Sequence, residues 1–151
     1  MFFYRSLLAA SSLALLAACH EQSTQTAQES AGPAPTGPQC YAYTSATDTI
    51  RLTLQTTQPT VTGQLTYHYF EKDRNRGTIS GTMHGDTLLA DYTFQSEGTT
   101  SVRQVAFLRR DIGFIEGFGP VVEGQGKVTF KQPRALQYDA KYTLVPVACP
   151  K

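Results

Sequence analysis

Apolar and polar residues alternate with a period of two along most of the chain after residue 49. Ile50, Leu52 and Leu54 fall on one side of the first such run, and polar residues fall between them. A period of two is typical of strands with one buried face. Seven more runs follow, near residues 61–69, 79–83, 88–94, 103–107, 114–118, 128–130 and 142–149. No ten-residue window has helical periodicity, so we expect eight to ten short strands.

The connections between these runs are short and rich in Gly, Pro, Asp and Ser, as in "TTQPT", "HGD" and "RRDIG". Short turns join antiparallel neighbours, whereas parallel strands need long crossovers. The sequence therefore predicts an all-β, antiparallel meander. We expect it to close into a barrel of eight to ten strands, with the architecture of lipocalins and avidins, because closure removes exposed strand edges. A two-sheet β-sandwich is the alternative.

The N-terminus has a different pattern, because Arg5 precedes the apolar run "SLLAASSLALLAAC". A basic residue, a short apolar stretch and small residues are typical of a secretion signal. Residues 16–19, "LAAC", resemble the lipobox of bacterial lipoproteins. The resemblance implies that residues 1–18 are removed and that Cys19 becomes the lipidated first residue. His20 follows where an Asp would favour inner-membrane retention, so the resemblance implies outer-membrane anchoring in the cell envelope.

Residues 19–39 read as a tether. After Cys19 the stretch "HEQSTQTAQESAGPAPTGPQ" contains no aromatic residue and no aliphatic residue larger than Ala, so it lacks the apolar surface that ordering requires. The globular part is then a single β-barrel domain over residues 40–151. Removing Arg5 leaves twelve basic and twelve acidic residues. This balance excludes an electrostatic case for nucleic-acid binding.

Cysteine usage fits an oxidising compartment. Once Cys19 is lipidated, Cys40 and Cys149 remain, almost at the two ends of the domain. We expect them to form one disulfide that closes the domain. A free catalytic thiol is the alternative for either residue.

The longest charged loop contains "EKDRNR", with Arg74 and Arg76. Successive turns of a meander alternate between the two ends of a barrel, so this loop shares one end, called end A, with the turn that contains Glu97. Binding residues usually lie on loops and at barrel mouths. The alternative is that the loop is only the solvated tip of a hairpin.

Two charges fall on the inward phase of the strands. Arg103 shares the phase of Val105 and Phe107, and Glu116 shares that of Phe114 and Phe118. Buried charges need partners, so we expect an ion pair between Arg103 and Glu116, which Glu97 would extend to a triad. Tyr67, Tyr69 and Tyr92 fall on the same phase and are expected to line the wall, or to be plain core.

Catalytic and cofactor motifs are absent from the sequence. The three histidines have no metal-site spacing, and "GFGPVVEGQG" is not followed by a helix. We therefore predict no metal and no cofactor. Glu97 and Glu116 are the one pair we consider for a hydrolase of envelope polymers, which would need two facing carboxylates roughly 5 to 9.5 Å apart.

The run "EKDRNRGTISGTMHGDTLLADYTFQSEGTTSVRQVAF", followed by "GFIEGFG", resembles uncharacterised small β-domain lipoproteins of Bacteroidota-type bacteria. The resemblance spans residues 40–149 and implies an envelope location and a small β domain. It implies no activity and assigns no functional residue.

Together these observations predict a monomeric binding or interaction module anchored to the membrane through Cys19. Its expected partner is a small polar ligand or an envelope protein. The predicted contact residues are Tyr67, Tyr69, Arg74, Arg76, Glu97, Arg103 and Glu116. A hydrolase and a purely structural lipoprotein are the alternatives.

Overall fold

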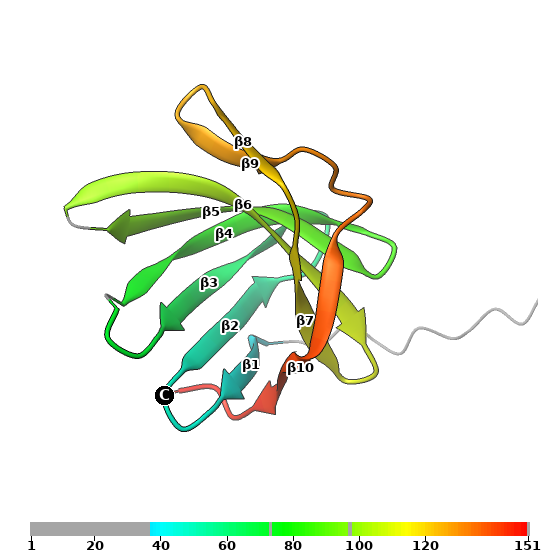
Figure 1. Ribbon diagram of the computed structural model, residues 1–151. Helices are drawn as coiled ribbons and strands as arrows, with labels where there is room; N and C mark the ends of the chain where they lie inside the picture. The colour runs from blue at the N-terminus through cyan, green and yellow to red at the C-terminus, as the bar shows by residue number, and fades with distance from the viewer. Residues whose placement is uncertain (1–36, 73, 97, 151) are drawn as a thin grey trace, which may run out of the picture. The chain divides into compact units, whose positions relative to one another are not determined.

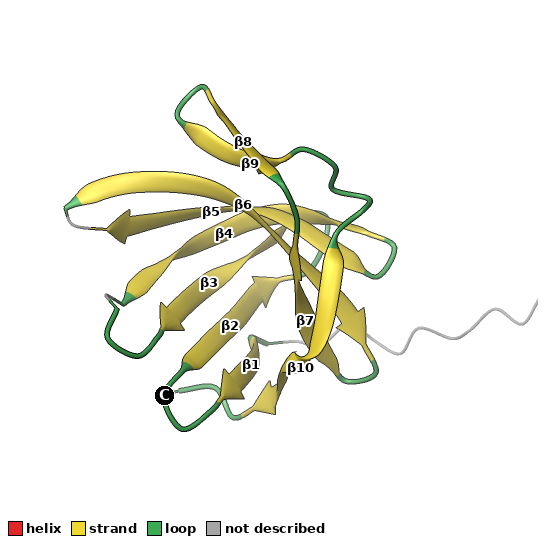
Figure 2. Cartoon of the chain, in the orientation of Figure 1, coloured by secondary structure: helices red, strands yellow, loops and turns green. Residues whose placement is uncertain are grey.

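Ten β-strands form the fold in the computed structural model, which describes residues 37–72, 74–96 and 98–150 (Figure 1). The strands are β1 (Gln39–Thr44), β2 (Thr49–Thr56), β3 (Val61–His68), β4 (Asn75–His84), β5 (Thr87–Ser96), β6 (Thr99–Arg110), β7 (Gly113–Phe118), β8 (Val121–Gly124), β9 (Lys127–Phe130) and β10 (Gln137–Val147). The described residues form no helix, and hence none able to cross a membrane (Figure 2). The predicted signal peptide, Cys19, most of the tether and Glu97 lie outside the described residues.

Eight of the strands close into an antiparallel barrel. Strands β1 to β6 each pair with the next one along the chain, β7 pairs with β10, and β10 pairs with β1. The sheet therefore meets itself with no gap between two separate layers. This confirms the predicted barrel and excludes the two-sheet sandwich. The β3–β4 connection marks end A (Figure 1). The strand registers and the Cys40–Cys149 bond place both cysteines at the opposite end, end B.

The last third of the chain departs from a simple meander. After β7 the chain leaves the barrel, forms the β8–β9 hairpin outside it, and returns as β10 (Figure 1). Strand β9 pairs in parallel with β6, through Val102↔Lys127 and Arg103↔Val128. Pro120 follows the end of β7, where it cannot donate a backbone hydrogen bond to a ladder. The stretch 121–124, part of a predicted loop, is a strand, and so is 39–44, for which the pattern named no run.

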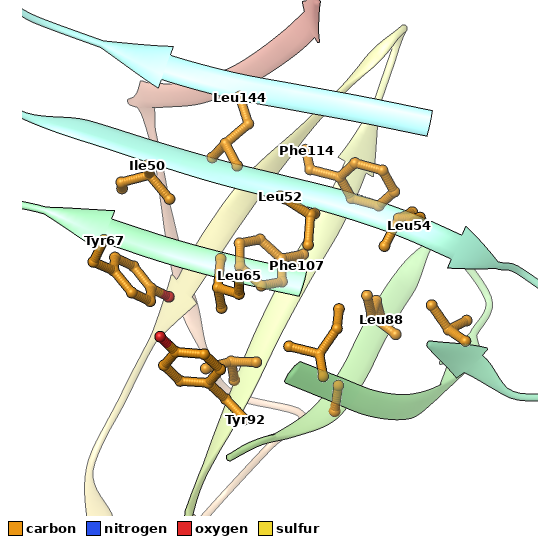
Figure 3. Close-up of a cluster of buried hydrophobic side chains, with 14 residues drawn as sticks. Ile50, Leu52, Leu54, Leu65, Tyr67, Leu88, Tyr92, Phe107, Phe114 and Leu144 are labelled. Carbon is orange, nitrogen blue, oxygen red and sulfur yellow. The ribbon is translucent and has the colours of Figure 1, made fainter. Parts of the chain in front are cut away.

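The barrel interior is filled by large apolar side chains from the inward phase of every barrel strand. Leu52, Leu65, Leu88, Phe107 and Leu144 are fully buried and converge on one cluster (Figure 3). Burying each such side chain stabilises the fold by about 1.5 to 3 kcal/mol. The core therefore occupies the middle of the barrel, and the residues nearer end A are left to form a more polar layer above it.

Strands β1 and β10 form the seam that closes the barrel, with three residue pairs in register, Cys40↔Val147, Tyr41↔Pro146 and Ala42↔Val145. Next to this short ladder, the disulfide between Cys40 and Cys149 joins residues 109 positions apart, with their Cα atoms 5.2 Å from each other. The predicted disulfide is confirmed. It fixes the two ends of the domain to one another at end B.

Glycine lets the wall curve tightly beside end A. Gly77 on β4 is opposite Leu65 and Phe94 in register, so it faces the interior. A Cβ atom at Gly77 would overlap the carbonyl oxygen of Thr93 and lie 2.8 Å from the Cα atom of Phe94. Only glycine permits this approach of β4 to β5.

Candidate functional site: a polar layer below the barrel mouth

The described candidate residues separate into two groups. Tyr67, Tyr69, Arg103 and Glu116 come together inside the barrel near end A, through contacts among their side chains. Arg74 and Arg76 instead line a hollow on the outer face of β2, β3 and β4. The sequence analysis had predicted one site for residues that in fact lie in two, the barrel interior and its outer face.

Glu116 is the buried charged residue among the described positions, at 4% exposure. It is on β7, opposite Phe107 in register, and therefore faces the interior. The hydroxyl of Tyr67, on the far wall, donates a hydrogen bond to Oε1 of Glu116 at 2.5 Å. This bond joins β3 to β7 across the barrel, so the two residues form a polar bridge between opposite walls.

Arg103 lies among aromatic rings. Its guanidinium carbon is 4.9 Å from the ring centre of Tyr67, 5.6 Å from that of Tyr92 and 5.8 Å from that of Phe94. Tyr92 is opposite Arg103 in register, which brings the two side chains to the same level of the wall. A cation over several aromatic faces is attracted by their quadrupoles, by about 2 kcal/mol or more where water is excluded.

The predicted ion pair between Arg103 and Glu116 is wrong. These two described residues do not approach within ion-pair distance, and Glu116 is instead bonded to Tyr67. The reason is the β6–β7 register. Glu116 is opposite Phe107, four residues along β6 from Arg103, which corresponds to about 13 Å along a strand.

Four buried polar atoms in this layer have no hydrogen-bond partner. They are Oδ1 of Asn75, the hydroxyl oxygen of Tyr92, Nε of Arg103 and Oε2 of Glu116. Asn75 is opposite Tyr67 in register, so it too lies on the inward phase at end A. Each unpartnered buried polar group costs about 1 to 3 kcal/mol. Buried polar atoms of this kind are satisfied in proteins by ordered water or by a bound polar molecule.

Burial determines the acid–base properties of this layer. It raises the pKa of Glu116 from 4.5 to about 7, against the opposing effects of the Tyr67 hydrogen bond and of Arg103. Burial and Glu116 raise the pKa of Tyr67 well above 10. The pKa values of Tyr69 and Tyr92 are raised to about 12, mainly by burial. The tyrosines thus remain neutral hydrogen-bonding groups near neutral pH, and Glu116 exchanges between carboxylic acid and carboxylate.

Side chains that are only partly buried surround this layer at its end A side. Tyr67 and Tyr92 are closed off from solvent, whereas Tyr69, Phe94 and Arg103 keep part of their surface exposed. Tyr69 stacks on Tyr67 with ring centres 5.7 Å apart, and Phe94 stacks on Tyr92 at 4.7 Å. In Figure 3 the hydroxyls of Tyr67 and Tyr92 turn toward the same part of the interior. Aromatic rims above hydrogen-bonding groups are typical of small-ligand sites.

This arrangement can bind and orient a polar molecule. Arg103 supplies a donor, Asn75 an acceptor, and Tyr92 either one. No group of three or more His, Cys, Asp or Glu side chains suited to a metal ion occurs in the described part of the chain. For a paired-carboxylate hydrolase, Glu116 has a pKa suited to a general acid, but its predicted partner Glu97 lies outside the described residues.

Two contributors to the layer, Asn75 and Phe94, were not predicted as site residues, whereas Tyr92 was expected on the inward wall with Tyr67 and Tyr69. Phe94 falls in the same alternating run as Tyr92, so its phase was a usable signal. Asn75 carries no signal of its own, because its place depends on register: it is opposite Tyr67.

Comparison of the chain with protein-family models, with curated proteins and with solved structures finds no match. The function is therefore argued from the geometry of the site.

Proposed function

We propose that this protein is a lipid-anchored binding module of the cell envelope that holds a small polar ligand at end A of its barrel. The observation that carries the proposal is the layer of unpartnered buried polar atoms on Asn75, Tyr92, Arg103 and Glu116. A ligand that supplies their missing partners would recover the free energy that desolvation of these groups costs.

The anchor part of the proposal rests on the N-terminal sequence. The run ending in "LAAC" supports lipidation at Cys19, and the polar stretch after it supports a tether between membrane and barrel. The disulfide between Cys40 and Cys149 fits an oxidising compartment outside the cytoplasm. An outer-membrane location follows from the same reasoning and belongs to the proposal.

The free groups indicate the chemistry of the ligand. Arg103 Nε needs an acceptor, Asn75 Oδ1 needs a donor, and Glu116 Oε2 accepts when ionised and donates when protonated. The ligand therefore carries donors and acceptors close together, as hydroxylated sugars and zwitterionic amino acids do. It is small, because apolar side chains fill the barrel below this layer.

The experiment is a calorimetric titration of the purified full-length protein with two probe sets, monosaccharides such as N-acetylglucosamine and amino acids such as serine. We expect one probe set to bind and the other to show no binding at concentrations up to about 10 mM.

Arg103→Met keeps an unbranched side chain against the rings but removes the donor, and should weaken binding by about tenfold or more. Arg109→Met, on the same strand at end B with an exposed side chain, is the matched control. The proposal is contradicted if neither probe set binds, or if Arg103→Met binds the probe with the same affinity as the unaltered protein.

A second candidate, a lipoprotein that contacts partner proteins, is favoured by one observation. Phe118, Val121 and Val122 are about half exposed, at 51%, 49% and 47%, and follow one another along β7 and β8. Strand β8 pairs only with β9 among the described strands, so its other edge is open to a further strand.

A further inference from the structure

A row of basic and polar side chains crosses the outer face of the barrel on strands β2, β3 and β4. Arg51 is opposite Thr66 in register, and Thr66 is opposite Arg76, so the three stand side by side. Neighbouring strands are about 4.8 Å apart, which places the backbone positions of Arg51 and Arg76 about 10 Å from each other. Arg74, in the loop before β4, reaches the same place.

These residues line two adjoining hollows. One, of about 340 Å³, is bounded by Arg51, Thr66, Arg74 and Arg76 together with Thr53, Gln64 and Pro150. The other, of about 260 Å³, shares Arg51, Thr66 and Arg74 and adds Thr49 and His68. Since three residues belong to both hollows, we treat them as one feature, the arginine groove.

The arginine groove concentrates positive charge that the described surroundings do not neutralise. No described carboxylate lines it, and the two ion pairs among the described side chains, Arg109–Asp86 and Lys127–Asp91, lie elsewhere. Arg76 donates a hydrogen bond to Oε1 of Gln64 at 3.2 Å, which orients its guanidinium along the groove. The cluster is a local feature, because the chain as a whole has a formal net charge of only +1.

We infer that the arginine groove binds a soluble phosphorylated molecule through its phosphate group. Guanidinium groups present paired N–H donors that match phosphate oxygens, and two of them side by side on one face can bind the same anion. The hydroxyls of Thr49, Thr53 and Thr66 supply further donors along the floor.

The lining favours a soluble ligand over a membrane headgroup. Apart from Pro150, every lining side chain of both hollows is polar or charged. A surface that rests on a bilayer normally adds aromatic or aliphatic side chains to its basic ones. The exposed large hydrophobic residues of the described chain, Phe70, Ile112, Phe118, Val121, Val122 and Val145, are absent from the lining. This groove is on the outside of the barrel, so its occupation is independent of the ligand proposed for end A.

The test is a calorimetric titration of the full-length protein with inorganic phosphate at constant ionic strength. We expect binding in the millimolar range or tighter, and a loss of about tenfold or more in Arg51→Gln and in Arg76→Gln, because each removes charged hydrogen bonds to the anion. Both side chains are exposed, so the variants should fold as the unaltered protein does. Arg110→Gln, an exposed arginine at the far end of β6, should bind phosphate with unchanged affinity.

A second titration, in the presence of vesicles, distinguishes the two sources of phosphate. Neither phosphatidylglycerol nor phosphatidylcholine vesicles should alter phosphate affinity. Selective loss of phosphate binding with phosphatidylglycerol would overturn the inference in favour of a lipid headgroup. No binding at about 10 mM phosphate, or equal affinity in Arg51→Gln and Arg110→Gln, would also overturn it. Since the end A titration uses uncharged or zwitterionic probes and Arg103→Met, either proposal can fail while the other stands.

Discussion

Removing the disulfide with Cys40→Ala and Cys149→Ala together should lower the free energy of unfolding by about 4 to 5 kcal/mol. The bond closes a loop of 109 residues, and in the chain-entropy model a cross-link of this span restricts the unfolded chain by about that amount. The disulfide also lies beside the shortest strand pairing of the barrel, in which only three residue pairs join β1 to β10. Domains of this size typically have 5 to 15 kcal/mol of stability, by order of magnitude, so the loss is a large share.

Urea unfolding followed by circular dichroism measures this effect. A reducing agent should destabilise the unaltered protein by a similar amount and leave the double variant unchanged, which separates loss of the bond from loss of cysteine packing. An unfolding midpoint that is the same with and without the disulfide would show that the seam holds without it.

Between about pH 4.5 and pH 7 the protein should lose about 3 kcal/mol of stability as the pH rises, through Glu116 alone. Its pKa is about 7 in the fold and 4.5 ordinarily, because burial disfavours the carboxylate. Below pH 4.5 both states are protonated and the contribution is fully present. Above that value the unfolded chain releases its proton first, so unfolding becomes progressively easier until the folded carboxyl also ionises. One pKa unit is worth about 1.4 kcal/mol, so the rise in the pKa of Glu116 from 4.5 to about 7 corresponds to about 3 kcal/mol.

Glu116→Gln isolates this contribution, because an amide has no charge to bury and keeps an acceptor for the Tyr67 hydroxyl. The stability difference between the unaltered protein and Glu116→Gln should change by about 3 kcal/mol over the window. Because the two proteins differ only at residue 116, the contributions of all other groups cancel in the comparison. Glu123→Gln, at an exposed position on β8, should follow the unaltered protein at every pH. Parallel pH profiles for the unaltered protein and Glu116→Gln would mean that this carboxyl is not buried.

The fold was largely predictable because its strands have one buried face. The apolar residues Ile50, Leu52 and Leu54 alternate with polar ones in the sequence, and all three are buried in the core. Strand β8 was missed because all four of its residues are exposed, so burial imposes no alternation on them. The parallel contact of β9 with β6 has no signal in a local pattern, since it depends on where the chain returns in space.

The sequence predicted correctly which side chains of the candidate site point into the barrel, but it did not predict their positions along the barrel axis. The phase of Arg103 and Glu116 correctly placed both inside, yet phase does not specify register, and the register sets them four residues apart. The hydrogen bond from Tyr67 to Glu116 joins residues 49 positions apart on different walls. Arg51 likewise joins Arg76 only through the registers of two successive strand pairs. The side-chain periodicity can be read from a single sequence, whereas contacts between distant strands depend on the register with which the barrel closes.

The central claim, that the polar layer at end A holds a small ligand, is tested most directly by a crystal structure of the full-length protein with the probe that binds best. The account predicts a bound molecule whose polar atoms lie within hydrogen-bond distance of Nε of Arg103 and Oε2 of Glu116, below the rims of Tyr69 and Phe94. A structure in which these atoms bond to each other or to ordered water alone, with the probe elsewhere or absent, would contradict it.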